Sequence, residues 1–279
     1  MELFLDPTMQ LWGAGVPLGL VSCSLALRQV GMRGKTKLGS SEADVMSFEM
    51  IAGACLVYLA YYGAVCSGCT ENRGIFLGQL YTFSQGTWFG FFGDLDTLVS
   101  GGAYAESPFV REKILIPMLA YQWWNFCVGL YLPEFGDFPS LAHHAVTMGI
   151  SYLCITGPVF QYYAVYFLGC SEVSTVPLTI VDIFAKFPRY QERFVWLNTI
   201  SRLLFAGLFL VSRVIYFPVL DYYFWTHCYE MYQGGVIRQY GPVFFFLIAN
   251  VFMTGLQFFW GAKMVGFVSN TIAGPKKKN

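Results

Sequence analysis

Seven apolar stretches, each near the length that crosses a bilayer, dominate this sequence. A helix needs about 20 mostly apolar residues to span a hydrocarbon core of ~30 Å. Only 12% of the residues are charged and 56% are hydrophobic, a composition typical of chains whose solvent is mostly lipid. We therefore predict an all-α integral membrane protein with about seven transmembrane helices, at 9–27, 45–66, 114–132, 140–156, 158–184, 198–220 and 241–268.

The segment 74–100 is apolar too, but glycines, Asp94 and Asp96 interrupt it. We interpret it as re-entrant, interfacial or lumenal, and the distribution of basic residues supports this. With the N-terminus outside and seven spans, ten Lys and Arg residues fall in inside loops and four in outside loops, as the positive-inside rule requires. An eighth span would place the first basic loop and the basic tail on opposite sides.

The C-terminal tail predicts the compartment. Lys276 and Lys277 lie four and three residues from the end, in a pattern that resembles the dilysine signal read by the coat-protein retrieval machinery. A basic flank behind the last span is the alternative interpretation. Both place the C-terminus in the cytosol. We expect a multi-pass protein of the endoplasmic reticulum membrane with a lumenal N-terminus.

Equal numbers of acidic and basic residues, 17 each, favour no nucleic-acid partner. Cys66 and Cys69 could form a disulfide, but the further ligands of a zinc site are missing. We therefore expect no metal and no bound cofactor.

Two adjacent histidines, His143 and His144, are the sharpest chemical feature. They lie near the cytosolic start of the fourth stretch, where a neutral imidazole could act as a general base on an amine or hydroxyl. Thr147 lies one helical turn further on, so its hydroxyl could orient either ring. The alternative is a pair of interfacial histidines with no chemistry.

The fifth stretch carries Glu172, Ser174 and Thr175 just before Pro177. Proline cannot donate a backbone hydrogen bond inside a helix, so we predict a break, with Ser174 or Thr175 capping the helix that restarts. From there Thr175, Thr179 and Asp182 share one face by their spacing. This face could line a polar cavity or make interhelical hydrogen bonds.

Two arginines, Arg202 and Arg213, lie nearly on one helical face of the sixth stretch, which we expect to end at Pro218. A buried guanidinium needs a carboxylate or phosphate partner. Glu172 and Asp182 are available, so ion pairing and headgroup binding both remain open.

These motifs resemble the TLC domain shared by ceramide synthases and related proteins of the endoplasmic reticulum. The resemblance rests on His143-His144-x-x-Thr147, on Glu172-x-Ser174-Thr175, and on Arg213 with Pro218. Ceramide synthases carry a His-Asp-x-x-Asp segment that this sequence lacks. The resemblance is therefore closest to TLC-domain proteins that are distinct from ceramide synthases. The resemblance implies an N-terminal helix and basic cytosolic loop at 1–44, a TLC domain at 45–270 in which six helices form a barrel around a lipid cavity, and a dilysine-like tail at 271–279.

By resemblance, His143, His144 and Glu172 would carry acyl transfer, with acyl-CoA as co-substrate and membrane lipids as partners. The cavity would be lined by Thr147, Ser174, Thr175, Thr179, Asp182, Arg202 and Arg213. We expect a protein of lipid metabolism that acylates a sphingoid base or a phospholipid, with His143 as base. The alternative is a non-catalytic lipid-binding or cargo-sorting protein of the ER-Golgi system.

Overall fold

The computed structural model describes residues 3, 6–68, 104, 108–157 and 159–273, and these residues form helices joined by short turns. The segment 74–100, Cys69 and the lysines of the tail lie outside the described residues. The described helices are α2 (Pro7–Gln29), α3 (Glu42–Gly68), α6 (Pro108–Val110), η2 (Arg111–Leu115), α7 (Ile116–Tyr131), η3 (Pro133–Phe135), α8 (Phe138–Thr156), α9 (Gln161–Ala164), η4 (Val165–Gly169), η5 (Cys170–Ser174), α10 (Thr175–Lys186), α11 (Pro188–Arg193), α12 (Val195–Phe209), η6 (Leu210–Tyr216), α13 (Phe217–Gln233) and α14 (Tyr240–Ala273).

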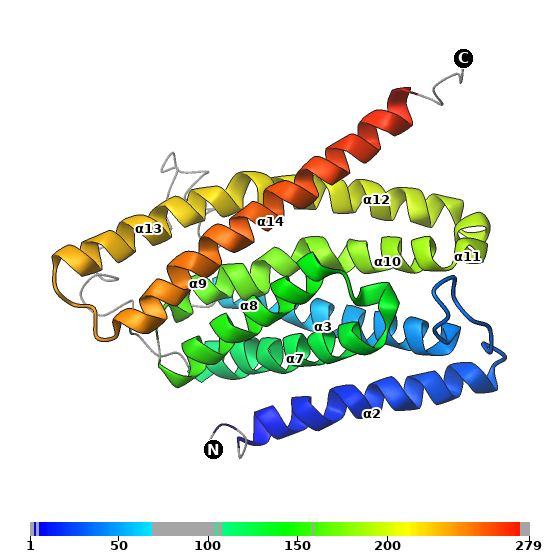
Figure 1. The fold of residues 1–279 in the computed structure, drawn as a ribbon, viewed down its shortest axis with the longest axis horizontal. Coiled ribbons are helices and arrows are strands. Elements are labelled where there is room, and N and C mark those ends of the chain that lie inside the picture. Colours follow the sequence, from blue (N-terminus) through cyan, green and yellow to red (C-terminus); the bar gives the residue numbers. More distant parts are fainter. Residues whose placement is uncertain (1–2, 4–5, 69–103, 105–107, 158, 274–279) are drawn as a thin grey trace.

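Helices lie at all seven predicted positions, which confirms the prediction of an all-α membrane protein. Within the described part of the chain, five helices are long and apolar enough to cross a membrane, at Pro7–Gln29, Glu42–Gly63, Gln161–Lys186, Val195–Gln233 and Tyr240–Gly266. The other two positions hold α7 and α8, which form an antiparallel pair inside the bundle (Figure 1). That α7 and α8 also cross the membrane stays a prediction.

The N-terminal helix α2 lies on the outside of the bundle, against α3 and α7 (Figure 1). The indole nitrogen of Trp124 on α7 donates to the backbone oxygen of Gly13, at 3.2 Å. Most other α2 side chains are exposed, and Leu11 and Leu18 are among them, as expected for a helix that faces lipid. Among the described residues, six further helical segments pack around the interior, which agrees with the predicted six helices plus one.

The sixth predicted stretch does not end at Pro218, and this prediction was wrong. The helix runs without a break for 39 residues, from Val195 to Gln233. The π-helical segment η6 comes directly before α13, and Pro218 lies in the first turn of α13. The wider π turn leaves room for the proline ring. The α-helical hydrogen bond that a proline cannot donate is therefore not needed at this position.

The fifth stretch is also continuous, from Gln161 to Lys186, so the predicted break is instead a local change of helix type. The π-helical η4 passes into the 3₁₀-helical η5, and α10 begins at Thr175 with Pro177 in its first turn. Ser174 precedes α10 but makes no capping hydrogen bond. Its hydroxyl donates to the backbone oxygen of Ser171 at 3.0 Å.

A close contact between two backbones explains why the helix changes type here. A Cβ atom on Gly63 of α3 would lie 2.4 Å from the backbone of Gly169 and of Cys170. The Cys170 thiol also donates to the backbone oxygen of Gly63, at 3.1 Å. Small residues permit such close helix packing in membranes. The η4–η5 segment is therefore fixed against α3.

One end of the bundle carries the α2–α3 connection, the α7–α8 turn and α11 (Figure 1), and we call it the basic end. Glu134 in the α7–α8 turn accepts hydrogen bonds from Thr36 and from Ser40 of the α2–α3 connection. Burial raises the pKa of the Glu134 carboxyl, but these hydrogen bonds outweigh it and hold the pKa below its usual range. Lys186 pairs with Glu49 at the same end.

Substitution of Gly63 by alanine is expected to destabilise the protein, because the new methyl group meets backbone that cannot move aside. We expect a cost of about 1 to 3 kcal/mol, measured as a lower midpoint of thermal unfolding in detergent. Gly207→Ala is the control, since no atom lies within 4 Å of its Cβ position. Equal midpoints for the two variants would contradict the contact.

Glu134→Gln is expected to loosen the α2–α3 connection, because an amide accepts hydrogen bonds more weakly than a carboxylate. A carboxyl whose pKa is lowered by folding stabilises the fold above its unfolded pKa of about 4.3 and loses this contribution as pH falls through the folded pKa. The difference in thermal midpoint between wild type and Glu134→Gln should therefore be full at pH 7 and shrink below pH 4. A difference that grows on acidification would exclude this role.

Candidate functional site

A cavity of about 790 Å³ lies inside the bundle, and each of the six inner helical segments contributes to its wall. No residue of α2 lines it. Six of the ten residues predicted from the sequence lie on this wall: His143, His144, Glu172, Thr175, Arg202 and Arg213. Most of the remaining wall is apolar, with side chains such as Leu56, Leu178 and Phe209. The cavity therefore combines a polar cluster with space for an apolar chain.

The ring of His144 is held by an amide from the neighbouring helix. Its Nδ1 lies 2.6 Å from Oε1 of Gln122 on α7. The amide nitrogen of Gln122 donates to the sulfur of Met118 at 3.1 Å, which leaves the amide oxygen toward the ring. An amide oxygen only accepts hydrogen bonds, so Nδ1 must carry the proton. The lone pair of a neutral His144 is then on Nε2.

His143 has different surroundings. Its ring centroid lies 5.4 Å from that of His144 and 5.6 Å from that of Trp260 on α14. Its buried Nδ1 has no hydrogen-bond partner among the described residues. The two histidines line the same cavity, but only the ring of His144 is oriented by a side-chain hydrogen bond.

Thr147 does not have the predicted role. Its hydroxyl donates to the backbone oxygen of His143 at 2.8 Å, the usual bond of a threonine inside a helix. The residue that orients a histidine ring is Gln122 instead. Gln122 was missed in the sequence because a single amide within an apolar stretch is also typical of ordinary helix packing.

The buried Arg213 forms an ion pair with Glu172. Of the two interpretations left open by the sequence, ion pairing and headgroup binding, the structure has the ion pair. The Nη2 of Arg213 lies 3.2 Å from Oε1 of Glu172 and 2.9 Å from the hydroxyl of Thr175. Its Nε donates to the hydroxyl of Ser174 at 2.9 Å. Glu172 and Arg213 are both buried. This cluster joins η6 to η5 at the inner end of the cavity.

The predicted polar face of α10 is only partly correct. Thr175 lines the cavity, but the wall continues through Leu178 and Val181. The methyl group of Thr179 points at α3, where it would meet a Cβ on Gly53 at 3.1 Å. Asp182 interacts electrostatically with Lys186 and Arg202 but does not line the cavity. Helical spacing identified the shared face but not the helix that it would contact.

Two basic side chains lie at the cavity's other end, toward the basic end of the bundle. Arg202 on α12 donates to Oδ1 of Asn198 at 2.9 Å. Lys263 on α14 lies with its Nζ 4.3 Å from the ring centroid of Phe259. Lys263 was missed in the sequence because it lies near the end of the last apolar stretch, where a basic flank is expected.

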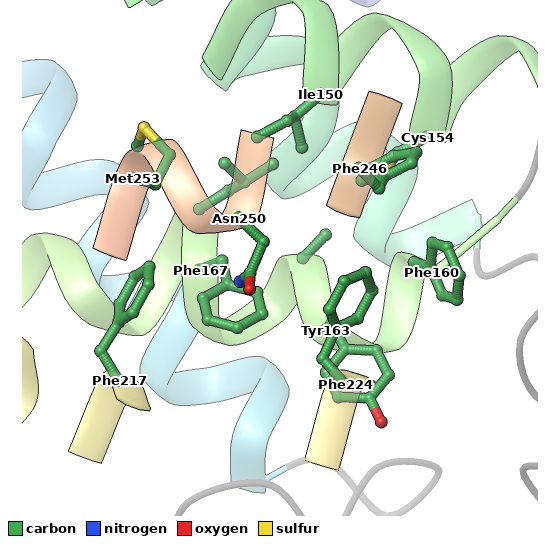
Figure 2. Close-up of a pocket in the computed structure, with 12 residues that line it drawn as sticks. Ile150, Cys154, Phe160, Tyr163, Phe167, Phe217, Phe224, Phe246, Asn250 and Met253 are labelled. Atoms are coloured by element: carbon green, nitrogen blue, oxygen red, sulfur yellow. The ribbon is translucent and has the colours of Figure 1, made fainter. Parts of the chain in front are cut away.

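A smaller cavity, of about 50 Å³, is lined by residues of α8, α9, η4, α13 and α14 (Figure 2). Figure 2 shows that aromatic rings surround it, including Phe167, Phe217 and Phe224. The only amide on its wall, Asn250, already binds Asp221 and Trp225. The hydroxyl of Tyr163, also on the wall, lies 3.4 Å from Nδ1 of His227. In the described parts of the chain, no three His, Cys, Asp or Glu side chains gather to hold a metal ion.

Removing one partner of the Arg213–Glu172 pair is expected to destabilise the fold strongly, because the other charge stays buried. Arg213→Met alone should cost about 3 to 5 kcal/mol, and Arg213→Met with Glu172→Gln should recover part of this loss. Thermal unfolding of the purified variants in detergent measures both effects. A single variant as stable as wild type would show that the pair does not hold η5 to η6.

Comparison with known proteins identifies the family. The family model described as TLC domain matches residues 54–266, which is most of the chain and includes every residue of the histidine and arginine clusters. No curated protein and no solved structure matches the chain. The separation from ceramide synthases stays a prediction from the motifs. The chain therefore belongs to the TLC-domain family and is a multi-pass membrane protein of that family.

Proposed function

We propose that this protein is an acyltransferase of membrane lipid metabolism, which transfers an acyl group from acyl-CoA to the amine or hydroxyl of a lipid. The observation that carries the proposal is the orientation of His144 by Gln122 at the wall of a large cavity. A neutral imidazole with one nitrogen held in place is suited to general-base catalysis. The apolar part of the wall suits an acyl chain.

In the proposed reaction, Nε2 of His144 accepts the proton of the acceptor's hydroxyl or amine. The acceptor oxygen or nitrogen bonds to the acyl carbonyl carbon, and the carbon–sulfur bond of the thioester breaks. The CoA thiolate leaves and takes the proton from the imidazolium, so the ring becomes neutral again. One acyl-CoA and one acceptor give one acyl lipid and one free CoA.

We propose roles for Glu172 and His143 that differ from those first expected. Glu172 pairs with Arg213 and binds no histidine in the described contacts, so we assign it a positioning role in the wall. His143 lies next to His144 but lacks an orienting partner. We therefore propose His144 as the base, in place of His143, with His143 as the neighbouring group at the reaction centre.

The proposed location is the membrane of the endoplasmic reticulum, with the N-terminus in the lumen and the C-terminus in the cytosol. The distribution of Lys and Arg and the dilysine-like tail support this proposal. The coat-protein retrieval machinery is then the expected partner of the tail. The cavity mouth at the basic end would face the cytosol, where acyl-CoA is found.

His144→Gln is expected to lower product formation by roughly 10² to 10⁴-fold, the usual contribution of a general base. Lipidomics of membranes with matched amounts of wild type, variant and empty control measures the product. His227→Gln is the matched control, because this third histidine does not line the cavity. If wild type and His144→Gln change the lipids equally, or not at all, the histidines are structural and the non-catalytic lipid-binding function becomes the better account.

Gln122 is expected to act as a positioning residue. Gln122→Leu removes the acceptor of the Nδ1 proton and should lower kcat with little change in KM, whereas Gln122→Glu keeps an acceptor and should retain more activity. Steady-state kinetics of both variants with the identified substrate gives the comparison. Equal kcat values for Gln122→Leu and wild type would show that the contact does not orient the base.

A further inference from the structure

The charges on the cavity wall do not balance. Its charged residues are Glu172, Arg202, Arg213 and Lys263. Arg213 and Glu172 neutralise each other as a buried ion pair. Arg202 interacts with Asp182, which lies off the wall, so Lys263 is the wall cation without an ion pair among the described residues. We call the part of the wall that carries Arg202 and Lys263 the mouth. With the pair neutralised, the charge left on this part of the wall is positive.

The two mouth cations differ in how they are held. Arg202 is oriented by Asn198 and interacts with Asp182, while Asp182 also interacts with Lys186. Lys263 forms no ion pair with any residue that the structure describes, and its ammonium group lies over the ring of Phe259. Cationic side chains within a membrane protein are costly unless an anion or water solvates them. Lys263 is therefore free to bind an anionic ligand.

The α12 and α14 sides of the mouth carry exposed residues. Leu203 of α12 lines the cavity and is 69% exposed. α14 touches η6 at Gly261, where a Cβ would lie 3.1 Å from Val214. Beyond this contact, α14 runs away from the bundle toward its C-terminal end (Figure 1). Lys263 lies just beyond this contact and is exposed, so a ligand from outside the bundle can reach it.

We infer that the lipid substrate of this cavity carries a phosphate headgroup, which binds Arg202 and Lys263 while its acyl chain lies along the apolar wall. The inference rests on the proposed function, because it places the substrate in the same cavity. Arg and Lys are the side chains that bind phosphate oxygens most strongly. A long-chain amine would bring a positive charge to a site that is already positive, so the charge favours a phospholipid over a sphingoid base.

The test measures binding to the purified full chain by native mass spectrometry. The probes are a lysophosphatidate and a monoacylglycerol with the same acyl chain. Arg202→Gln with Lys263→Gln is expected to weaken lysophosphatidate binding at least tenfold and to leave monoacylglycerol binding unchanged. The control is Lys35→Gln with Lys37→Gln, which removes two exposed charges of the α2–α3 connection and should change neither affinity.

Two further binding measurements distinguish failure of this inference from failure of the proposed catalytic function. His143→Ala with His144→Ala should still bind lysophosphatidate, so loss of catalysis alone leaves the inference intact. Free CoA is the second phosphate source. If the Arg202/Lys263 variant loses CoA binding but keeps lysophosphatidate binding, these residues bind the CoA phosphate and the lipid assignment is overturned. If the Arg202/Lys263 variant loses lysophosphatidate binding and monoacylglycerol binding equally, the inference is also overturned. The substitutions would then have changed the shape of the cavity, and not only its charge.

Discussion

The buried ion pair between Arg213 and Glu172 is the interaction on which the rest of the inner structure depends. It is built from two helix segments that are not α-helical, because Glu172 lies in the 3₁₀-helical η5 and Arg213 in the π-helical η6. The start of η5 is fixed to α3 by the close approach of Gly63 to Cys170, and by the hydrogen bond from the Cys170 thiol to the backbone oxygen of Gly63. The two contacts together hold η5 between α3 and η6, and charge inside the bundle is neutralised there rather than exposed to lipid.

The cavity and its chemistry follow from this arrangement. Both residues of the ion pair lie on the cavity wall, together with the histidines, Arg202 and Lys263. The α7–α8 pair supplies both partners of the oriented base, since Gln122 and His144 lie on adjacent helices. A polar site near the mouth and an apolar wall around it are what a reaction between a soluble thioester and a membrane lipid requires.

The sequence alone predicted the features that depend on composition and local pattern. Apolar length predicted the helices, and the cost of burying charge identified His143, His144, Glu172 and Arg213 as residues that need partners. It did not predict features that depend on which helices meet. Thr179 shares a face with Thr175 but contacts α3, and Gln122 becomes informative only when His144 is found beside it. Pro218 did not end its helix because the π turn before it removes the clash.

The most direct test of the account is acyl transfer by the purified protein itself. The full chain in lipid nanodiscs would be mixed with isotopically labelled acyl-CoA and total membrane lipid extract, and both labelled lipid and free CoA would be measured by mass spectrometry. The account predicts that one labelled acyl-lipid class appears in equal molar amount with the free CoA, and that His144→Gln abolishes both. No labelled lipid from a folded wild-type protein, or the same amount from His144→Gln, would contradict it.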